Sequence, residues 1–321
     1  MRLIRVLAPV LASVVALTSC GGDGDDSKGS GPHGLERPDL TVGVLPIADS
    51  AAVMLARSKG FFRAEGLNVK VEIIQGGATA TPKLLSGLLD ATLTNYVSLF
   101  IARERGNDLQ IVADAAASRP GLFTIMVTKD SPVRAPADLK GKVVAVNTLK
   151  NIGELASLAT LKNAGVEAKD VRFVEYPLPN MAPALEKRAV EAAWMTEPFI
   201  TGGKNKLGLR SIADTMTGPM ADFPIAGWVV TRRFADKNPK TVAAFRRAVV
   251  KAQALLAADR AELEAVLPTY TSIDAATAKA VTVPTFPTKL DPARIQRVPD
   301  VMRQYGYLTG KADAAAAIVA P

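Results

Sequence analysis

The sequence predicts an α/β protein of two domains, each built on a mainly parallel sheet that helices cover on both faces. Three observations lead to this fold class. Short apolar, β-branched runs alternate along the chain with amphipathic stretches, which is the order of elements that parallel sheets require. A helix, a tight turn and a strand also occur twice at a constant offset of 101 residues, beginning at Leu84 and at Leu185. The chain has 321 residues, and a single hydrophobic core divides in two near that size.

The N-terminus has the features of an export signal. Arg2 and Arg5 precede an apolar run over residues 6–17 that is too short to span a bilayer. The run leads into Leu-Thr-Ser-Cys, which resembles a bacterial lipobox, and Cys20 is the only cysteine of the chain. We therefore predict a signal peptide over residues 1–19 and lipidation of Cys20. The alternative is an ordinary secretory signal that happens to contain a cysteine.

The segment over residues 20–38 is rich in Gly, Asp and Ser and is expected to form a flexible tether. His33, the only histidine, lies in it, so the predicted folded body contains neither His nor Cys. This excludes internal disulfides, zinc sites built on these residues, iron–sulfur clusters, and Ser-His-Asp or Cys-His catalysis. No dinucleotide-binding or P-loop signature is present. We predict no metal, no cofactor and no catalytic residue, although catalysis by carboxylate, lysine or tyrosine stays open.

The charge of the chain indicates a solvated surface. The formal net charge is +8, and it falls to +6 when Arg2 and Arg5 leave with the signal peptide. The charged residues are scattered and aromatic residues make up 5% of the chain, so we expect no nucleic-acid partner.

The first domain is predicted over residues 39–127 and 229–321. Asp49 or Ser50 can cap its first helix, and Pro82 stands where a first helical position is expected after Thr81. Asn238 and Pro239 form a cap and first position for a long amphipathic helix. In order, the predicted elements are strand Thr41–Leu45, helix Ala51–Lys59, strand Val69–Ile74, a helix from Pro82, strand Ala91–Thr94, helix Val97–Arg105, strands Leu109–Ala113 and Leu122–Val127, the returning strand Trp228–Thr231, and the helix from Pro239.

The second domain is predicted over residues 128–228. Its strand Val143–Val146 is a short apolar run of the kind that is buried on both faces of a parallel sheet. Asn151 stands three residues before Glu154, the spacing of a helix N-cap and its reciprocal partner, and this helix should end at Gly165. The further predicted elements are strand Val171–Val174, helix Met181–Lys187, strand Ala192–Met195 and a helix from Pro198.

The repeat places two strand ends in equivalent positions. Asn95 and Tyr96 follow the strand of the first copy, and Thr196 and Glu197 follow that of the second. If the two domains face each other, both strand ends meet at one cleft, where ligands of open α/β sheets bind. A free helix N-terminus beside a strand end also favours anionic or hydrogen-bond-accepting groups. Chance similarity between two αβ units is the alternative.

Several short motifs then resemble a known family. The chain is similar to the SsuA/THI5-like (NMT1-like) substrate-binding proteins of ABC importers, which cover sulfonate, taurine, nitrate and thiamine-pyrimidine-precursor binders and a eukaryotic thiamine-pyrimidine synthase. The resemblance implies a type II periplasmic-binding-protein fold, in which two crossover strands join two domains that close by a hinge. It extends from Thr41 to about Ala258. The motifs are Lys59-Gly60-Phe61-Phe62 with Glu65-Gly66-Leu67, Gly87-Leu88-Leu89-Asp90-Ala91, Asp138-Leu139-Lys140-Gly141-Lys142-Val143, and Ala193-Trp194 with Glu197-Pro198-Phe199.

The resemblance also implies ligand-binding residues, all of them at strand ends or helix starts. Each has a structural alternative: a turn for the glycines, a helix cap for the asparagine of the second domain, a core position for the aromatic residues, and a first-turn carboxylate for the glutamate. The predicted ligand-binding residues are Asp49, Ser50, Gly76, Gly77, Asn95, Tyr96, Thr148, Asn151, Trp194 and Glu197.

The ligand class is open at this point. Lys150 and the helix N-terminus beside it suit a sulfonate, a nitrate-like anion or a carboxylate. Glu197 and two aromatic rings suit a cationic or amine-bearing nitrogen heterocycle, and Glu197 would repel an anion. The balance favours a neutral or nitrogen-rich organic ligand.

Taken together, we expect an exported, monomeric lipoprotein on the outer face of the cell membrane or in a periplasm, which captures a small organic molecule and delivers it to the permease and ATPase of an ABC importer. Two alternatives are a thiamine-pyrimidine-synthase-like enzyme and a ligand sensor without a transport role. The synthase uses a histidine and a cysteine-rich segment, which the predicted folded body lacks.

Overall fold

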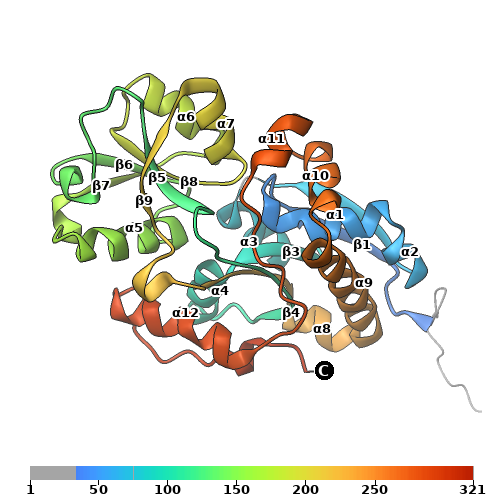
Figure 1. Ribbon diagram of the computed structural model, residues 1–321. Coiled ribbons are helices and arrows are strands. Elements are labelled where there is room, and N and C mark those ends of the chain that lie inside the picture. The colour runs from blue at the N-terminus through green and yellow to red at the C-terminus, as the bar shows by residue number, and fades with distance from the viewer. Residues whose placement is uncertain (1–33, 75, 321) are drawn as a thin grey trace, which may run out of the picture.

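The computed structural model describes residues 34–74 and 76–320, which form two lobes, each around a five-stranded sheet (Figure 1). In the first lobe the strand order is β2-β1-β3-β10-β4, and in the second it is β7-β6-β8-β5-β9. The strands are β1 (Asp39–Val44), β2 (Asn68–Ile73), β3 (Ala91–Asn95), β4 (Leu109–Ala117), β5 (Phe123–Val127), β6 (Val143–Val146), β7 (Arg172–Glu175), β8 (Ala192–Thr196), β9 (Arg210–Asp214) and β10 (Pro224–Thr231).

Both sheets are mainly parallel, with one reversed strand each. β1 pairs in parallel with β2 and β3, and β6 pairs in parallel with β7 and β8. β10 is antiparallel to both of its neighbours, β3 and β4, and β5 is antiparallel to β8 and β9. The predicted fold class is therefore confirmed: the two sheets repeat one topology, and each takes its reversed strand from a segment that arrives from the other lobe.

Helices flank both sheets. Several of them begin just after a parallel strand. The helices are α1 (Ala51–Ser58), α2 (Phe61–Ala64), α3 (Gly77–Leu85), α4 (Tyr96–Glu104), α5 (Ile152–Asn163), α6 (Leu178–Glu186), α7 (Phe199–Leu207), α8 (Arg232–Lys237), α9 (Pro239–Ala258), α10 (Arg260–Val266), α11 (Ala275–Ala280) and α12 (Pro292–Gln304). Over residues 34–74 and 76–320, none of them is both long and apolar enough to cross a membrane.

The internal repeat is confirmed in detail. Helices α3 and α6 and strands β3 and β8 begin and end at the predicted offset of 101 residues. The acidic residue of each tight turn has the same structural role: the Asp90 carboxylate accepts a hydrogen bond from the Thr41 amide at 2.8 Å, and Glu191 accepts one from the Val143 amide at 2.9 Å. Each carboxylate thus ties the beginning of one strand, β1 or β6, to the turn before its parallel neighbour, β3 or β8.

The chain crosses from one lobe to the other slightly earlier than the sequence predicts. β5 belongs to the second sheet, although the sequence analysis ended the first domain at Val127, and β10 enters the first sheet at Pro224 rather than after Trp228. The two connecting segments contact each other, because Ser118 donates from its amide to the Phe223 carbonyl and Phe223 donates to the Ser118 hydroxyl, at 2.9 and 2.6 Å. They form the paired crossover between the lobes.

The described fold also begins before the predicted end of the tether at Pro38. Leu35 is buried, and the Glu36 carboxylate accepts hydrogen bonds from the amides of Lys240 and Thr241 at the start of α9. This arrangement satisfies two of the free amides that a helix N-terminus exposes. The signal peptide, Cys20 and His33 lie outside the described residues.

The starts of α3 and α6 differ from their predictions. α6 begins at Leu178 rather than Met181, and α3 begins at Gly77, so Pro82 lies inside the helix and Thr81 is not its cap. The sequence analysis placed Gly76 and Gly77 before the helix, as ligand-binding residues, and used proline, which is favoured at a first helical position, as the start signal. The other predicted start of this kind is correct, since Pro239 opens α9 directly after Asn238.

Candidate functional site

A small enclosed cavity of about 40 Å³ lies between the lobes, at the strand ends of both sheets. The first lobe contributes residues from the ends of β1 and β3 and from the start of β10, and the second lobe contributes residues from β5, β6, α5, α6 and β8. The residues that line it are Leu45, Ile47, Asp49, Leu93, Thr94, Asn95, Phe123, Asn147, Ile152, Leu178, Trp194, Thr196, Ile225 and Ala226.

Four residues around this cavity carry a buried polar atom without a hydrogen-bond partner. These atoms are Asp49 Oδ1, Thr94 Oγ1, Asn147 Oδ1 and Thr196 Oγ1. Seven such atoms occur among the described residues, so more than half of them gather at one place. Leaving a buried polar group unpaired costs about 1–3 kcal/mol, and native proteins carry few such groups without a reason. The clustering therefore indicates that the cavity is built to receive a polar guest.

Asp49 dominates the electrostatics of the cavity. Its side chain is 2% exposed, and burial raises the pKa of its carboxyl group from 3.8 to about 7. No Lys, Arg or His side chain is among the lining residues. The nearby hydroxyl of Tyr270 donates to the Ile47 carbonyl at 2.9 Å, which holds the loop that carries Asp49 without pairing the carboxylate.

The indole of Trp194 forms a rigid wall of the cavity. It stacks on Phe123 with ring centroids 5.1 Å apart, and its Nε1 donates to the Thr215 hydroxyl at 3.0 Å. Its other side lies against the first turn of α5, where a Cβ atom on Gly153 would come within 2.7 Å of the ring. The ring is therefore held by stacking, a hydrogen bond and the backbone of a helix.

We expect Gly153→Ala to disturb this wall. The added methyl group must push the indole away from α5, which should lower the free energy of unfolding by about 1–3 kcal/mol, the usual cost of overpacking a core. Gly202→Ala is a matched control, because this glycine lies inside α7 with open space around its Cβ position. It should stabilise the protein by about 0.5–1 kcal/mol. Urea unfolding of both variants checks this; equal effects of the two would contradict the described packing of Trp194.

The structure brings three of the predicted ligand-binding residues to the cavity: Asp49, Asn95 and Trp194. Asn95 also caps α4, since its side chain accepts a hydrogen bond from the Ser98 amide at 2.9 Å. Ser50 is buried next to Asp49 and supports the loop, because its hydroxyl accepts from the Leu45 amide at 3.1 Å.

Thr148 and Asn151 lie in a neighbouring groove of about 300 Å³ that α3 and α4 form with the loop after β6. Asn151 is the N-cap of α5 as predicted, with its Oδ1 accepting from the Ile152 amide at 2.6 Å. Gly76 faces Thr148 across the lobes, with 3.9 Å between its Cβ position and the threonine hydroxyl, and Gly77 opens α3.

Tyr96 and Glu197 are placed away from the cavity, which corrects two expectations. Tyr96 is fully buried in the first lobe, where its hydroxyl donates to Asp114 at 2.9 Å. Because Asn95 ends β3 and caps α4, Tyr96 is already the first helical residue and turns into the core. Glu197 accepts hydrogen bonds from the amide and hydroxyl of Thr201, so it serves the first turn of α7. Tyr96, Thr148 and Trp194 were all predicted to bind the ligand, but they do not line one common cavity.

Sequence reasoning missed two of the polar residues at the cavity. Thr94 is the penultimate residue of β3, and Asn147 is the residue directly after β6. The strand-end rule selected Asn95, which lines the cavity, but missed its neighbour Thr94, and it selected Thr148 in place of Asn147. Thr196 was recognised as a strand end by the repeat but was passed over in favour of Glu197.

Among the residues that the structure describes, three hydrogen bonds join the two lobes away from the crossover segments. The Asn151 side-chain amide donates to the Ser98 hydroxyl at 2.7 Å, and the Tyr307 hydroxyl donates to Glu154 at 2.9 Å. On another side, the Thr282 amide donates to the Glu197 carboxylate at 3.2 Å. These three contacts belong to a closed arrangement, because each would break if the lobes separated.

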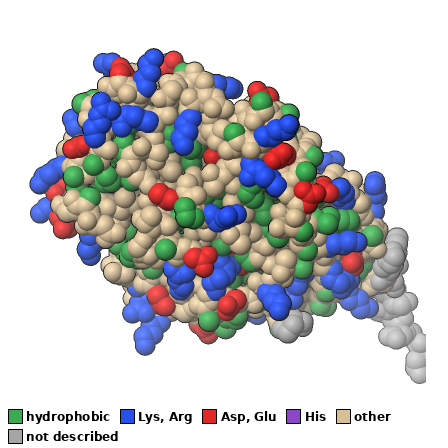
Figure 2. Space-filling view, in the orientation of Figure 1, with side chains coloured by type: hydrophobic (Ala, Val, Ile, Leu, Met, Phe, Trp, Pro, Cys, Tyr) green, Lys and Arg blue, Asp and Glu red, His purple; other side chains and the backbone are tan. Residues whose placement is uncertain are grey.

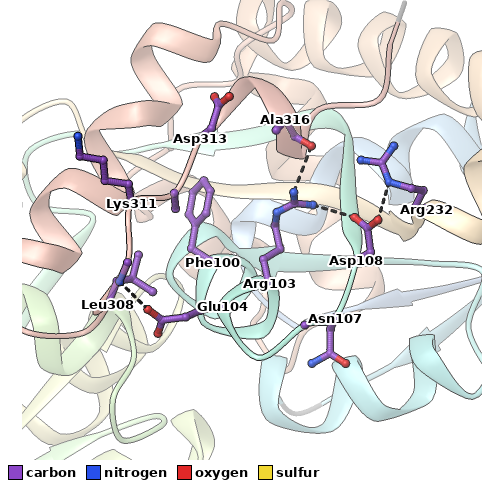
Figure 3. Close-up of a pocket in the computed structure, with 13 residues that line it drawn as sticks. Phe100, Arg103, Glu104, Asn107, Asp108, Arg232, Leu308, Lys311, Asp313 and Ala316 are labelled. Carbon is purple, nitrogen blue, oxygen red and sulfur yellow. Dashed lines mark hydrogen bonds and ion pairs between the residues drawn. The ribbon is translucent and has the colours of Figure 1, made fainter.

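A larger surface cavity of about 460 Å³ lies between α4, α8 and the C-terminal segment (Figure 3). Four of its charged side chains already have partners. Arg103 and Arg232 share the Asp108 carboxylate, and Glu104 accepts from the amides of Thr309 and Gly310. This cavity is therefore a weaker candidate than the small one between the lobes, where the polar atoms lack partners. The surrounding surface shows Lys and Arg side chains spread over both lobes, with Asp and Glu among them (Figure 2).

Comparison with protein families addresses the predicted resemblance directly. The model of the family described as NMT1/THI5 like matches residues 47–262, more than half of the chain. The chain belongs to the NMT1/THI5-like family. The matched range includes the ends of β3, β6 and β8 and every lining residue except Leu45, so it covers nearly the whole cavity of this NMT1/THI5-like protein.

The similar proteins differ in what their names say they do. One is the taurine-binding periplasmic protein of Escherichia coli (strain K12), 26% identical over 67% of this chain; the chain spans 65% of that protein, slightly less than two thirds. Another is a putative thiamine biosynthesis protein of Haemophilus influenzae, 26% identical over 81% of this chain and 84% of its own length. Among solved structures, the alkanesulfonate-binding protein SsuA from Xanthomonas axonopodis pv. citri bound to MOPS has a TM-score of 0.75 at 19% identity, covering 88% of this chain and 98% of the other.

Proposed function

We propose that this protein is an extracytoplasmic solute-binding protein that captures a small organic molecule between its two lobes and delivers it to an ABC importer. The cluster of unpartnered polar atoms at the strand ends of both sheets carries this proposal. Family membership and the similarity to proteins whose names describe periplasmic taurine binding support it. Export and lipidation at Cys20 belong to the same proposal, since they would hold the protein beside a permease.

Capture requires the lobes to move. The cavity of about 40 Å³ has room for a few water molecules at most, and no organic molecule can enter it while the three interlobe hydrogen bonds are made. The paired crossover segments around Ser118 and Phe223 are the natural hinge. A ligand shifts the balance toward closure only through contacts that exist in the closed form, and Asp49 in one lobe with Asn147 in the other offers such contacts.

The direct test identifies the ligand and then measures whether it changes the shape of the protein. Mass spectrometry of small molecules that co-purify with the protein, followed by thermal-shift assays on the ligand-free protein, should yield a compound that raises the melting temperature. Small-angle scattering should then show that this compound makes the protein more compact. A ligand that stabilises the protein without changing its radius of gyration would argue against capture by closure.

We expect Tyr307→Phe to open the ligand-free protein. The substitution removes the hydroxyl that donates to Glu154 across the lobes, a contact worth about 1.5–3 kcal/mol when the acceptor is charged. The radius of gyration of the free protein should rise, and the affinity for the identified ligand should fall about tenfold or more, because closure now costs more. Tyr305→Phe is the control. It removes a hydroxyl group from the same segment, and among the described residues that hydroxyl bonds no residue of the second lobe, while the ring contact with Lys162 is kept. An unchanged radius of gyration in Tyr307→Phe would contradict a role of this hydrogen bond in holding the lobes together.

An enzymatic role is the second candidate, because one relative is named as a putative thiamine biosynthesis protein. The chain has one cysteine and one histidine, Cys20 and His33, and both precede the described residues. A thiamine-pyrimidine synthase that depends on histidine and cysteine is therefore a poor match for this sequence. Conversion of any pyrimidine precursor by the purified protein would favour the enzyme.

A further inference from the structure

The cavity between the lobes presents hydrogen-bond acceptors to its guest. Asp49 supplies a carboxylate oxygen and Asn147 an amide oxygen, both buried and without a donor. The hydroxyl groups of Thr94 and Thr196 are also unpartnered and can donate or accept. A guest that satisfies Asp49 and Asn147 must therefore carry hydrogen-bond donors, and a positive charge on those donors would pair the buried carboxylate.

The two groups that the sequence offered to an anion, the N-terminus of α5 and Lys150, both interact with the protein itself. At the N-terminus of α5, the Ile152 amide donates to Asn151, and the Lys150 amide donates to Glu154. The Lys150 ammonium group lies 5.7 Å from the ring centroid of Tyr307 and does not line the cavity. The sequence analysis offered this helix N-terminus and Lys150 as the site for a sulfonate, a nitrate-like anion or a carboxylate. In the structure Lys150 does not line the cavity, and the Ile152 amide already has an acceptor.

Apart from Asn95, the rest of the wall is apolar. Leu45, Ile47, Leu178 and Ile225 surround the polar atoms, together with the edge formed by Phe123 and Trp194. Such a wall suits the hydrocarbon part of a small molecule, and it excludes the water that would otherwise screen a charge. The cavity therefore combines one buried carboxylate, neutral polar groups and an apolar lining.

Building on the proposed function, we propose that the guest of this cleft is a small organic cation with a protonated primary amine, whose N–H groups reach Asp49 from one lobe and Asn147 from the other, and that sulfonates and nitrate are rejected. An isolated sulfonate or nitrate would face the Asp49 carboxylate without a cationic partner. Taurine carries both a sulfonate and an ammonium group. Comparing it with compounds that carry only one of these groups shows which group decides binding.

The experiment uses compounds matched in carbon skeleton. Thermal-shift and calorimetric measurements at pH 8 compare primary amines and amino alcohols of two to six carbons, beginning with ethanolamine, with the corresponding sulfonates and carboxylates, beginning with isethionate, and with taurine and nitrate. We expect at least one amine to raise the melting temperature and bind, and isethionate and nitrate to have no effect. Binding of isethionate or nitrate as tight as that of the best amine would overturn the ligand class, and so would a panel in which no amine binds.

Two variants distinguish a specific role of the Asp49 carboxylate from the general effect of removing one negative charge. Asp49→Asn should weaken binding of the amine at least about tenfold, because the charged acceptor is lost. Asp236→Asn removes a carboxylate from the exposed face of α8 and should leave the affinity unchanged. Circular dichroism checks that both variants fold. If Asp49→Asn binds the amine as well as the parent protein does, the assignment of Asp49 as its partner is wrong.

The pH dependence adds a readout that a purely structural role would not move. An amine needs the ionised form of Asp49, whose pKa in the free protein is about 7, so the affinity should fall about tenfold for each pH unit below 7. Tyr270 is the ionisable side chain whose charge would act on Asp49, and burial raises its pKa well above its usual range, so it stays neutral throughout. Calorimetry at pH 6 in buffers of different ionisation enthalpy should show that binding releases a proton. A flat affinity between pH 5 and pH 8 would overturn the assignment.

Failure of this inference can be told apart from failure of the proposed function. A sulfonate or other anion that binds and makes the protein more compact would leave solute capture intact and end the amine assignment. If no compound of either group binds, and none changes the radius of gyration, both the ligand class and the capture of such solutes are contradicted.

Discussion

Trp194→Ala should lower the free energy of unfolding by about 3–5 kcal/mol, the usual range when a large aromatic side chain is removed from a core. The indole is 2% exposed, stacks on Phe123 and donates to the Thr215 hydroxyl, so its removal leaves a void and removes one of the two hydrogen bonds of that hydroxyl. Because the same ring is a wall of the cavity, the affinity for the ligand should fall by more than its contact area alone accounts for. Urea unfolding and calorimetry with the identified ligand measure the two effects.

Trp194→Phe is the matched control for this change. A phenyl ring can keep the stacking on Phe123 while losing the indole N–H that bonds Thr215. We expect it to cost about 1–2 kcal/mol and to retain much of the ligand affinity. A cost below about 1 kcal/mol for Trp194→Ala, or unchanged ligand affinity in that variant, would show that the ring does not support the cavity as described.

Asp49 should make the ligand-free protein less stable as the pH rises. Its carboxyl pKa is raised by burial from 3.8 to about 7 in the folded state, so between these values the folded protein holds a proton that the unfolded chain releases. Each pH unit in that window then favours unfolding by about 1.4 kcal/mol, for a total on the order of 4 kcal/mol by pH 8. Below about pH 4 both states are protonated and the penalty is absent.

Asp49→Asn isolates this contribution. The difference in unfolding free energy between variant and parent cancels the titration of the other groups, and it should grow from near zero at pH 4 to a few kcal/mol in favour of the variant at pH 8. Urea unfolding at pH 4, 6 and 8 provides the measurement. A difference that does not change with pH would mean that the carboxylate has a partner in solution. A stabilising change at a residue that the ligand needs is the trade-off expected of a binding site.

Much of the fold followed from local sequence signals. The strand Val143–Val146 has the predicted bounds, Asn151 caps the next helix, and the repeat at an offset of 101 residues matches α3 with α6 and β3 with β8. These features depend on neighbours a few residues apart: capping oxygens, apolar runs and tight turns. Local rules failed where a local signal was ambiguous, as at Pro82, which lies inside α3 although proline more often opens a helix.

The candidate site was only partly accessible to the same reasoning. Strand ends were found, but which side chain at each end faces the cleft depends on the turn into the following helix. Tyr96 turns into the core because Asn95 caps α4, and Glu197 serves α7, whereas Thr94 and Asn147 face the cavity. A shift of one residue at a strand end reverses the direction of the side chain, and sequence periodicity does not define the strand end that closely.

The sequence by itself determined the α/β class, the duplicated unit and the absence of His and Cys after residue 33, because these depend on composition and on short-range patterns. Only the tertiary structure decided which polar groups are left without partners. Asp49 and Asn147 are nearly one hundred residues apart and lie in different lobes, so their shared cavity exists only when the lobes close. Whether a buried group is paired depends on every segment packed around it, and that is a property of long-range contacts rather than of the chain read in order.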